Sequence, residues 1–283
     1  MKQFLLATLL ATPFVANAQN LPQSSPPGHV EQIVGLTTIK VDYARPSKRD
    51  RVIFGDLVPF GKVWRTGANK CTTVSFDGPV TIDGEVLAPG IYSLFTIPDQ
   101  SSWTVIFNKD TALWGEEDRK DSLDVLRIKV QPSKAYEPAE TFTIGFADVR
   151  DDKAYLQLRW ENVLVSMKVY ADATKQGIAN IKEAVADPKA GYGVFNRSAR
   201  FCVDRNIMLD SALEWAEKSV SLERKYWNLY TLALARAANG KTKEAIAAAE
   251  ESMKLAQAEK NDAYVKMNKE RIEEWSKPKP VRR

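Results

Sequence analysis

The sequence predicts an α+β protein, with an antiparallel β-sandwich or barrel-like N-terminal domain followed by a C-terminal bundle of helical hairpins. Three observations lead to this fold class. Apolar and polar residues alternate with a period of two in many stretches between residues 30 and 171, which is typical of half-buried strands. Turn motifs separate these stretches at short intervals. From about residue 172 the apolar residues recur at helical spacing instead.

The strand pattern is clearest in three stretches. Ile39, Val41 and Tyr43 alternate with polar residues, and the same alternation recurs in residues 141–146 and 156–160. Strands of this kind present one face to a core and the other to solvent. We therefore expect an all-β domain over residues 30–171.

Turn motifs divide this region into strands. Asp83-Gly84 is the strongest short hairpin signal in the chain. Glu161-Asn162 predicts a second turn, between a strand that ends at Trp160 and another over residues 163–170. We count roughly ten strands without a long helix between them, which favours an antiparallel arrangement over a parallel sheet.

The C-terminal region, residues 172–276, reads as a series of short helices. Ala212 and Ala245 lie 33 residues apart, and Gly240 follows an apolar helical stretch. This spacing resembles the period of about 34 residues in tetratricopeptide hairpins, and a generic helical bundle is the alternative. After a first helix that ends at Asp187-Pro188, helices are predicted near residues 192–205, 209–222, 226–238, 242–257 and 262–275.

The first residues predict export. Lys2 precedes an apolar stretch over residues 4–16, and Ala16 and Ala18 are the small residues that precede a cleavage site. Residues 1–18 therefore predict a signal peptide, followed by a flexible leader over residues 19–29. The protein is expected in the periplasm of a Gram-negative cell and otherwise outside the cell. No later segment is apolar enough to predict a membrane span.

Charge and composition exclude some partners. The formal net charge of +4 is too small to predict nucleic-acid binding. Residues 277–283 form a short basic tail, interpreted as a solvated end. The two cysteines, Cys71 and Cys202, fall in different predicted domains. Export permits a disulfide between them, but two separate buried thiols are the default expectation.

Catalytic and cofactor motifs are sparse, and no cofactor or metal is predicted. The one histidine, His29, falls in the predicted leader, which argues against a histidine-based triad and against multi-histidine zinc sites. No CxxC motif or glycine-rich phosphate loop occurs. Paired carboxylates for glycoside hydrolysis remain an alternative, although spacing singles out no pair among Asp42, Asp56, Asp77 and Glu85.

One segment carries a family resemblance. Its distinctive motifs are Tyr43-Ala44-Arg45-Pro46-Ser47, Ile53-Phe54-Gly55, Leu57-Val58-Pro59, Val63-Trp64-Arg65-Thr66-Gly67-Ala68-Asn69, Ala88-Pro89-Gly90-Ile91-Tyr92-Ser93-Leu94 and Trp103-Thr104-Val105-Ile106-Phe107-Asn108. With these motifs, residues 42–108 resemble domain-of-unknown-function family 2911, whose members are typically exported and often carry a helical extension. The family implies no catalytic residues. Lys70 departs from it, since similar sequences often have a small or acidic residue there.

The same segment contains the candidate binding residues Arg45, Arg51, Trp64, Arg65 and Asn69. Arginine suits anionic groups, and aromatic residues beside polar ones suit sugar rings. Successive strand residues face opposite ways, so either Trp64 is buried and Arg65 points outward, or the reverse holds. The alternative interpretation makes these arginines internal clamps that bind backbone carbonyls.

Three functions follow from these observations. The first is a binding module whose Arg/Trp-rich loops take a small anionic or carbohydrate ligand. The second is an envelope interaction protein that binds a peptide or protein partner through its helices. The third is a carboxylate-dependent hydrolase, so that enzymatic activity is the less favoured expectation.

Overall fold

The chain divides into two compact units at the predicted boundary. The computed structural model describes residues 21–277. A β unit ends at Ala171, and a helical unit begins at Asp172. The predicted signal peptide, the first two residues of the predicted leader and all of the basic tail except Lys277 lie outside the described residues.

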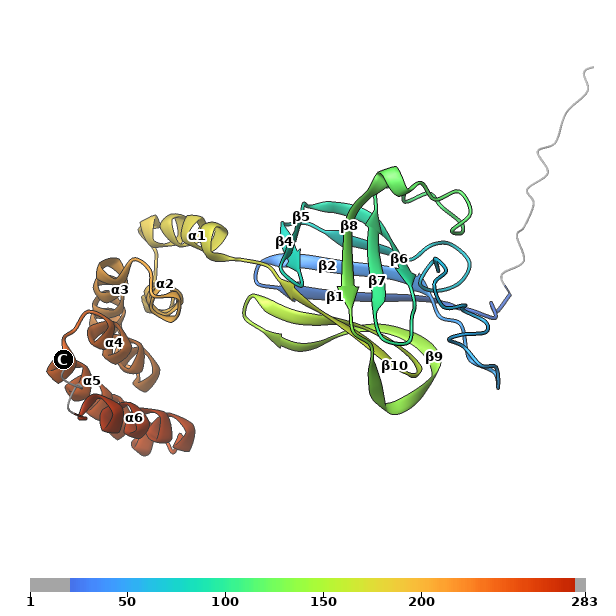
Figure 1. The fold of residues 1–283 in the computed structure, drawn as a ribbon. Coiled ribbons are helices and arrows are strands. Elements are labelled where there is room, and N and C mark those ends of the chain that lie inside the picture. The colour runs from blue at the N-terminus through green and yellow to red at the C-terminus, as the bar shows by residue number, and fades with distance from the viewer. Residues whose placement is uncertain (1–20, 278–283) are drawn as a thin grey trace, which may run out of the picture. The chain divides into compact units, whose positions relative to one another are not determined.

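The β unit contains two antiparallel sheets (Figure 1). One has six strands in the order β1-β2-β3-β6-β7-β8, and the other has four in the order β5-β4-β10-β9. The predicted all-β character and the antiparallel pairing are confirmed. The strands are β1 (Pro27–Val34), β2 (Thr37–Ala44), β3 (Thr73–Phe76), β4 (Val80–Ile82), β5 (Glu85–Leu87), β6 (Gly90–Ile97), β7 (Trp103–Asn108), β8 (Asp124–Val130), β9 (Ser133–Arg150) and β10 (Lys153–Tyr170).

The main apolar core lies between the two sheets, so the unit is a sandwich. Alternate residues of β2 face this core, as the sequence pattern predicts. The hydroxyl of Tyr43 on β2 donates to the carbonyl of Ile144 on β9 across 3.2 Å. Aromatic rings fill one part of the core, where the ring centroids of Trp64 and Trp160 are 5.8 Å apart and those of Trp64 and Phe142 are 5.1 Å apart. Large buried aromatics of this kind dominate core stabilisation.

Two strand boundaries differ from the prediction. β1 begins at Pro27, inside the segment predicted as a flexible leader, because proline is tolerated at the first residue of an edge strand. The predicted turn at Glu161-Asn162 is wrong: β10 runs through it with register shifts on both sides of Glu161, whose φ is +52°. An irregularity of this type bends a strand without ending it.

The helical unit consists of six helices in the described chain, and their positions agree closely with the predicted ones. The polypeptide forms successive antiparallel hairpins from α2 and α3 and from α4 and α5 (Figure 1). No helix of the described residues is long and apolar enough to cross a bilayer. The helices are α1 (Thr174–Ala186), α2 (Tyr192–Arg205), α3 (Leu209–Leu222), α4 (Tyr226–Ala238), α5 (Thr242–Ala258) and α6 (Asp262–Trp275).

Repeated hydrogen bonds stabilise the hairpins. Ser219 on α3 donates to the carbonyl of Tyr192 at 2.8 Å, and Ser252 on α5 donates to that of Tyr226 at 2.6 Å. Because the two serines are 33 residues apart and the two tyrosines 34, the contacts repeat with nearly the spacing of Ala212 and Ala245. The two contacts therefore recur at an interval of 33 to 34 residues.

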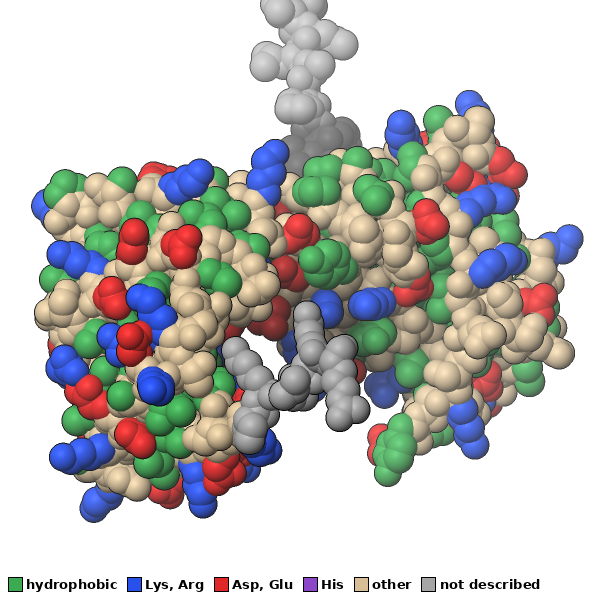
Figure 2. Space-filling model, turned by 60° about the vertical axis from the view of Figure 1, so that its left-hand side comes forward, with side chains coloured by type: hydrophobic (Ala, Val, Ile, Leu, Met, Phe, Trp, Pro, Cys, Tyr) green, Lys and Arg blue, Asp and Glu red, His purple; other side chains and the backbone are tan. Residues whose placement is uncertain are grey.

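Charged side chains of both signs are interspersed over the surface drawn in Figure 2, and no extended area of one sign is visible on that face. This distribution agrees with the small net charge of +4.

Candidate functional site

Two of the predicted site arginines bind nearby acceptors of the protein itself. Arg45, directly after β2, donates through Nε to the carbonyl of Phe142 at 3.3 Å and through Nη2 to Oγ1 of Thr143 at 3.2 Å. The exposed Arg51 donates to the carbonyls of Lys48 and Ser47 at 2.9 and 2.6 Å. These contacts agree with the clamp interpretation, since arginine's fork is well suited to several oxygen acceptors at once.

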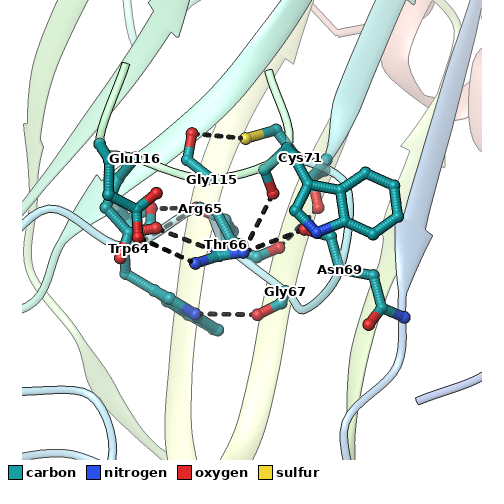
Figure 3. Close-up of polar contacts among 12 residues, drawn as sticks. Trp64, Arg65, Thr66, Gly67, Asn69, Cys71, Gly115 and Glu116 are labelled. Atoms are coloured by element: carbon teal, nitrogen blue, oxygen red, sulfur yellow. Dashed lines mark hydrogen bonds and ion pairs between the residues drawn. The ribbon is translucent and has the colours of Figure 1, made fainter. Parts of the chain in front are cut away.

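Trp64 belongs to the core. Only 8% of the residue is exposed, and its Nε1 donates to the carbonyl of Gly67 at 3.0 Å (Figure 3). Its backbone exchanges two hydrogen bonds with Thr96 of β6, at 2.7 and 2.9 Å. This pairing joins the loop between β2 and β3 to the sheet. Because successive strand residues face opposite ways, the next side chain, that of Arg65, points away from the core.

That next side chain, Arg65, joins two loops (Figure 3). Its Nε donates to Oε2 of Glu116 at 3.0 Å, and Nη2 lies 3.8 Å from Oε1 of Glu117. Its Nη1 donates to the carbonyls of Asn69 and Trp114 at 3.1 and 3.0 Å. The guanidinium thus fixes the loop after Trp64 against the loop between β7 and β8.

These two loops form one wall of a cavity of about 420 Å³ on the β unit. Of the five predicted site residues, only Asn69 lines it, and Arg65 supports the wall from behind. Trp114 also lines the cavity and is 70% exposed, but it was not among the predicted site residues. The sequence signal that could have identified it is a tryptophan directly before the polar run of residues 115–121. The cavity lining includes Asp42, Asn69, Lys70, Thr73 and Trp114.

Asn69 has two local functions. Its φ of +58° is in the left-handed region, which asparagine tolerates better than most residues. Its Nδ2 donates to the carbonyl of Ser25 at 3.2 Å, so its side chain holds the segment before β1. The residue therefore orders both the turn and the rim of the cavity.

Both cysteines are free and buried, as the default expectation held. Cys71 lines the cavity, and its Sγ donates to the carbonyl of Gly115 at 3.3 Å. Burial raises the pKa of Cys71 to about 11 and also raises that of Cys202. The Cys71 thiol is consequently protonated at neutral pH and is a poor nucleophile.

The position predicted for His29 is wrong, because it lies within β1 and not in a flexible leader. Its Nδ1 is 2.8 Å from Oδ1 of Asp42 on the neighbouring strand. Both side chains are at least half exposed, so the pair is a surface contact at the edge of the cavity. Among the described residues, no group of three or more histidine, cysteine, aspartate or glutamate side chains is arranged to hold a metal ion.

Comparison with known proteins gives one match. The model of a family described as "Protein of unknown function (DUF2911)" matches residues 25–169. The match covers more than half of the chain. It contains β1 to β9 completely and β10 except for its last residue, Tyr170. No curated protein and no solved structure matches the chain.

Proposed function

The chain belongs to the DUF2911 family, and we propose that it is an exported binding module whose β unit holds a carbohydrate in the cavity beside Trp114. The observation that carries this proposal is the combination of an indole that is 70% exposed with a backbone fixed by Arg65. Sugar rings present C–H groups to aromatic faces, and a rigid platform loses little entropy on binding.

The polar lining supports a carbohydrate. Asp42, Asn69 and Thr73 offer a carboxylate, an amide and a hydroxyl, which can exchange hydrogen bonds with sugar hydroxyls. Small-molecule sites typically combine an apolar surface with a few such groups. The cavity volume of about 420 Å³ is also within the usual range for a small ligand.

The charges favour a neutral sugar over an anionic ligand. The guanidinium groups of Arg45, Arg51 and Arg65 already donate to acceptors of the protein. Lys70 and Asp42 bring opposite charges to the lining, so the site offers an anion no concentrated positive field.

The same lining favours binding over glycoside hydrolysis. Hydrolysis of this type uses two carboxylates that flank the scissile bond. Among the described residues that line the cavity, Asp42 is the one carboxylate, and His29 already contacts it.

The experiment is isothermal titration calorimetry of the chain with neutral mono- to tetrasaccharides of glucose, mannose, galactose and N-acetylglucosamine. Replacing Trp114→Ala should weaken binding at least about tenfold, as loss of an aromatic anchor does. Tyr136→Ala is the control, because Tyr136 is 99% exposed and outside this cavity. Equal binding by the Trp114→Ala variant, or binding of inorganic phosphate or sulfate and of no sugar, would overturn the proposal.

A further inference from the structure

A second cavity, of about 360 Å³, lies where four segments of the β unit meet. The loop between β2 and β3 contributes Phe54 and Phe60, and the turn between β6 and β7 contributes Asp99. Lys134 comes from the start of β9, and Asn162 from the irregular part of β10. This cavity shares no lining residue with the one beside Trp114.

The aromatic wall of this cavity is fixed by its supports. The Phe60 ring rests on Gly55, where a Cβ atom would lie only 2.8 Å from Cε2 of that ring. Gly55 also has a φ of +97°, so both the close approach and the backbone favour glycine. Phe60 nevertheless remains 37% exposed. One face of the wall is therefore packed and another is open.

Phe54 connects this wall to the core. Its ring centroid is 5.0 Å from that of Trp103 and 6.3 Å from that of Trp160. The amide of Gly61 donates to the carbonyl of Pro98 at 2.9 Å, which ties the aromatic loop to the turn that carries Asp99. The aromatic surface is thus held in place before any ligand arrives, which lowers the entropy cost of binding.

Opposite charges lie at the rim. Asp99 and Lys134 are both exposed, and in the described part of the chain neither forms an ion pair with another side chain. The backbone amide of Gln100 donates to Oδ1 of Asp99 at 2.6 Å, which orients the carboxylate. A carboxylate, an ammonium group and a fixed aromatic wall thus line one cavity.

We propose that this cavity binds a small zwitterion with a large apolar side chain, namely an α-amino acid or a dipeptide. The ligand's ammonium group pairs with Asp99, its carboxylate with Lys134, and its apolar side chain packs on Phe54 and Phe60. A molecule with only one of the two charges leaves one rim group without a partner, so the arrangement selects for zwitterions. The inference does not depend on sugar binding beside Trp114.

Calorimetric titration of the full chain with L-phenylalanine and with glycyl-L-phenylalanine tests the proposal. The compound that binds more tightly identifies the size of the ligand. Phenethylamine and 3-phenylpropionate, which lack one charge each, should bind at least about fivefold more weakly. Asp99→Asn and Lys134→Gln should each weaken binding of the zwitterion by a similar factor. Phe60→Ala should weaken it by about tenfold.

Asp118→Asn and Lys109→Gln are matched controls, because both residues are exposed and neither lines the cavity. They should leave binding unchanged. The absence of heat with both zwitterions at millimolar concentration overturns the proposal, as does unchanged binding by Asp99→Asn and Lys134→Gln. These two surface variants keep the test decisive even if Phe60→Ala does not fold.

Discussion

The Nη1 atom of Arg65 donates to the carbonyl oxygen of Trp114 across 3.0 Å, although the two residues are 49 positions apart in the chain. Through the same atom Arg65 also holds the carbonyl of Asn69. An arginine predicted as a ligand contact therefore acts as a positioning residue, which fixes the backbone under an exposed indole. This relationship connects the stability of the β unit with the proposed sugar site.

Replacing Arg65→Ala should lower the free energy of unfolding of the β unit by about 1.5–3 kcal/mol, because it leaves the partly buried Glu116 carboxylate without this donor and removes two exposed hydrogen bonds to carbonyls. It should also weaken sugar binding through the loosened Trp114 loop. Urea unfolding and calorimetry measure the two effects. Arg51→Ala is the control and should cost less than about 1 kcal/mol, since the contacts of Arg51 are local and exposed.

Arg65→Lys distinguishes a positioning function from simple charge. Lysine keeps the positive charge but cannot reach several acceptors with a planar fork. Binding and stability should both fall in this variant. Wild-type values for Arg65→Lys would show that the charge alone matters and would contradict the clamp.

Arg119 and Asp124 form a buried ion pair that ties the loop between β7 and β8 to the sheet. Their side chains are 4% and 6% exposed, and the guanidinium also lies 5.4 Å from the centroid of the Phe95 ring. Arg119→Met should lower the free energy of unfolding, measured with urea, by about 2–3 kcal/mol, because it removes the buried partner of Asp124 and leaves Arg127 and Asn108.

Arg127→Met is the matched control for that change. It removes a second partner of Asp124, but its side chain is 44% exposed. Because exposed ion pairs contribute little, the cost should be about 1 kcal/mol or less. Similar costs for the two variants would show that burial of the Arg119–Asp124 pair is unimportant.

The raised pKa of Cys71 should make the stability of the β unit depend on alkaline pH. Burial raises the pKa from the ordinary 9.0 to about 11 in the folded chain. The unfolded chain therefore releases the thiol proton first, and the associated stability is complete below pH 9 and is lost as the pH rises through 11. The urea midpoint of unfolding should fall between pH 8 and pH 10, and this fall should be smaller in Cys71→Ala than in the wild type.

Cys202 is present in the wild type and in Cys71→Ala, so the difference between these two proteins reports on Cys71 alone. Alkylation by iodoacetamide gives a second measurement, because only the thiolate reacts. The native Cys71 thiol should stay unreactive at pH 8 and become accessible when urea unfolds the chain. An equal decline of the urea midpoints with and without Cys71 would contradict the prediction.

The sequence was most informative where structure depends on local pattern. The alternation of Ile39, Val41 and Tyr43 predicts the buried face of β2 because side chains alternate in every strand. Ala212 and Ala245 are both fully buried, because close helix packing needs small residues. Local pattern failed at Glu161, where a turn-like dipeptide forms an irregularity within β10, since the long pairing with β9 overrides it.

The candidate site was only partly predictable for the same reason. Arg45, Arg65 and Asn69 were identified by residue type, but each has an acceptor that is far away in the chain, at 97, 49 and 44 residues. No local rule reveals whether a guanidinium faces a ligand or a distant carbonyl. His29 gained its contact with Asp42 only through the pairing of β1 with β2.

The sequence by itself determined the α+β class, the boundary near Ala171, the strand faces and the helix spans, because periodicity is written into neighbouring residues. The tertiary structure alone decided which loops meet, and therefore that Trp114 and Asn69 line one cavity and that Phe60, Asp99 and Lys134 line another. The physical reason is that a cavity is formed by contacts between residues far apart in the chain, whereas periodicity constrains only the elements that carry them.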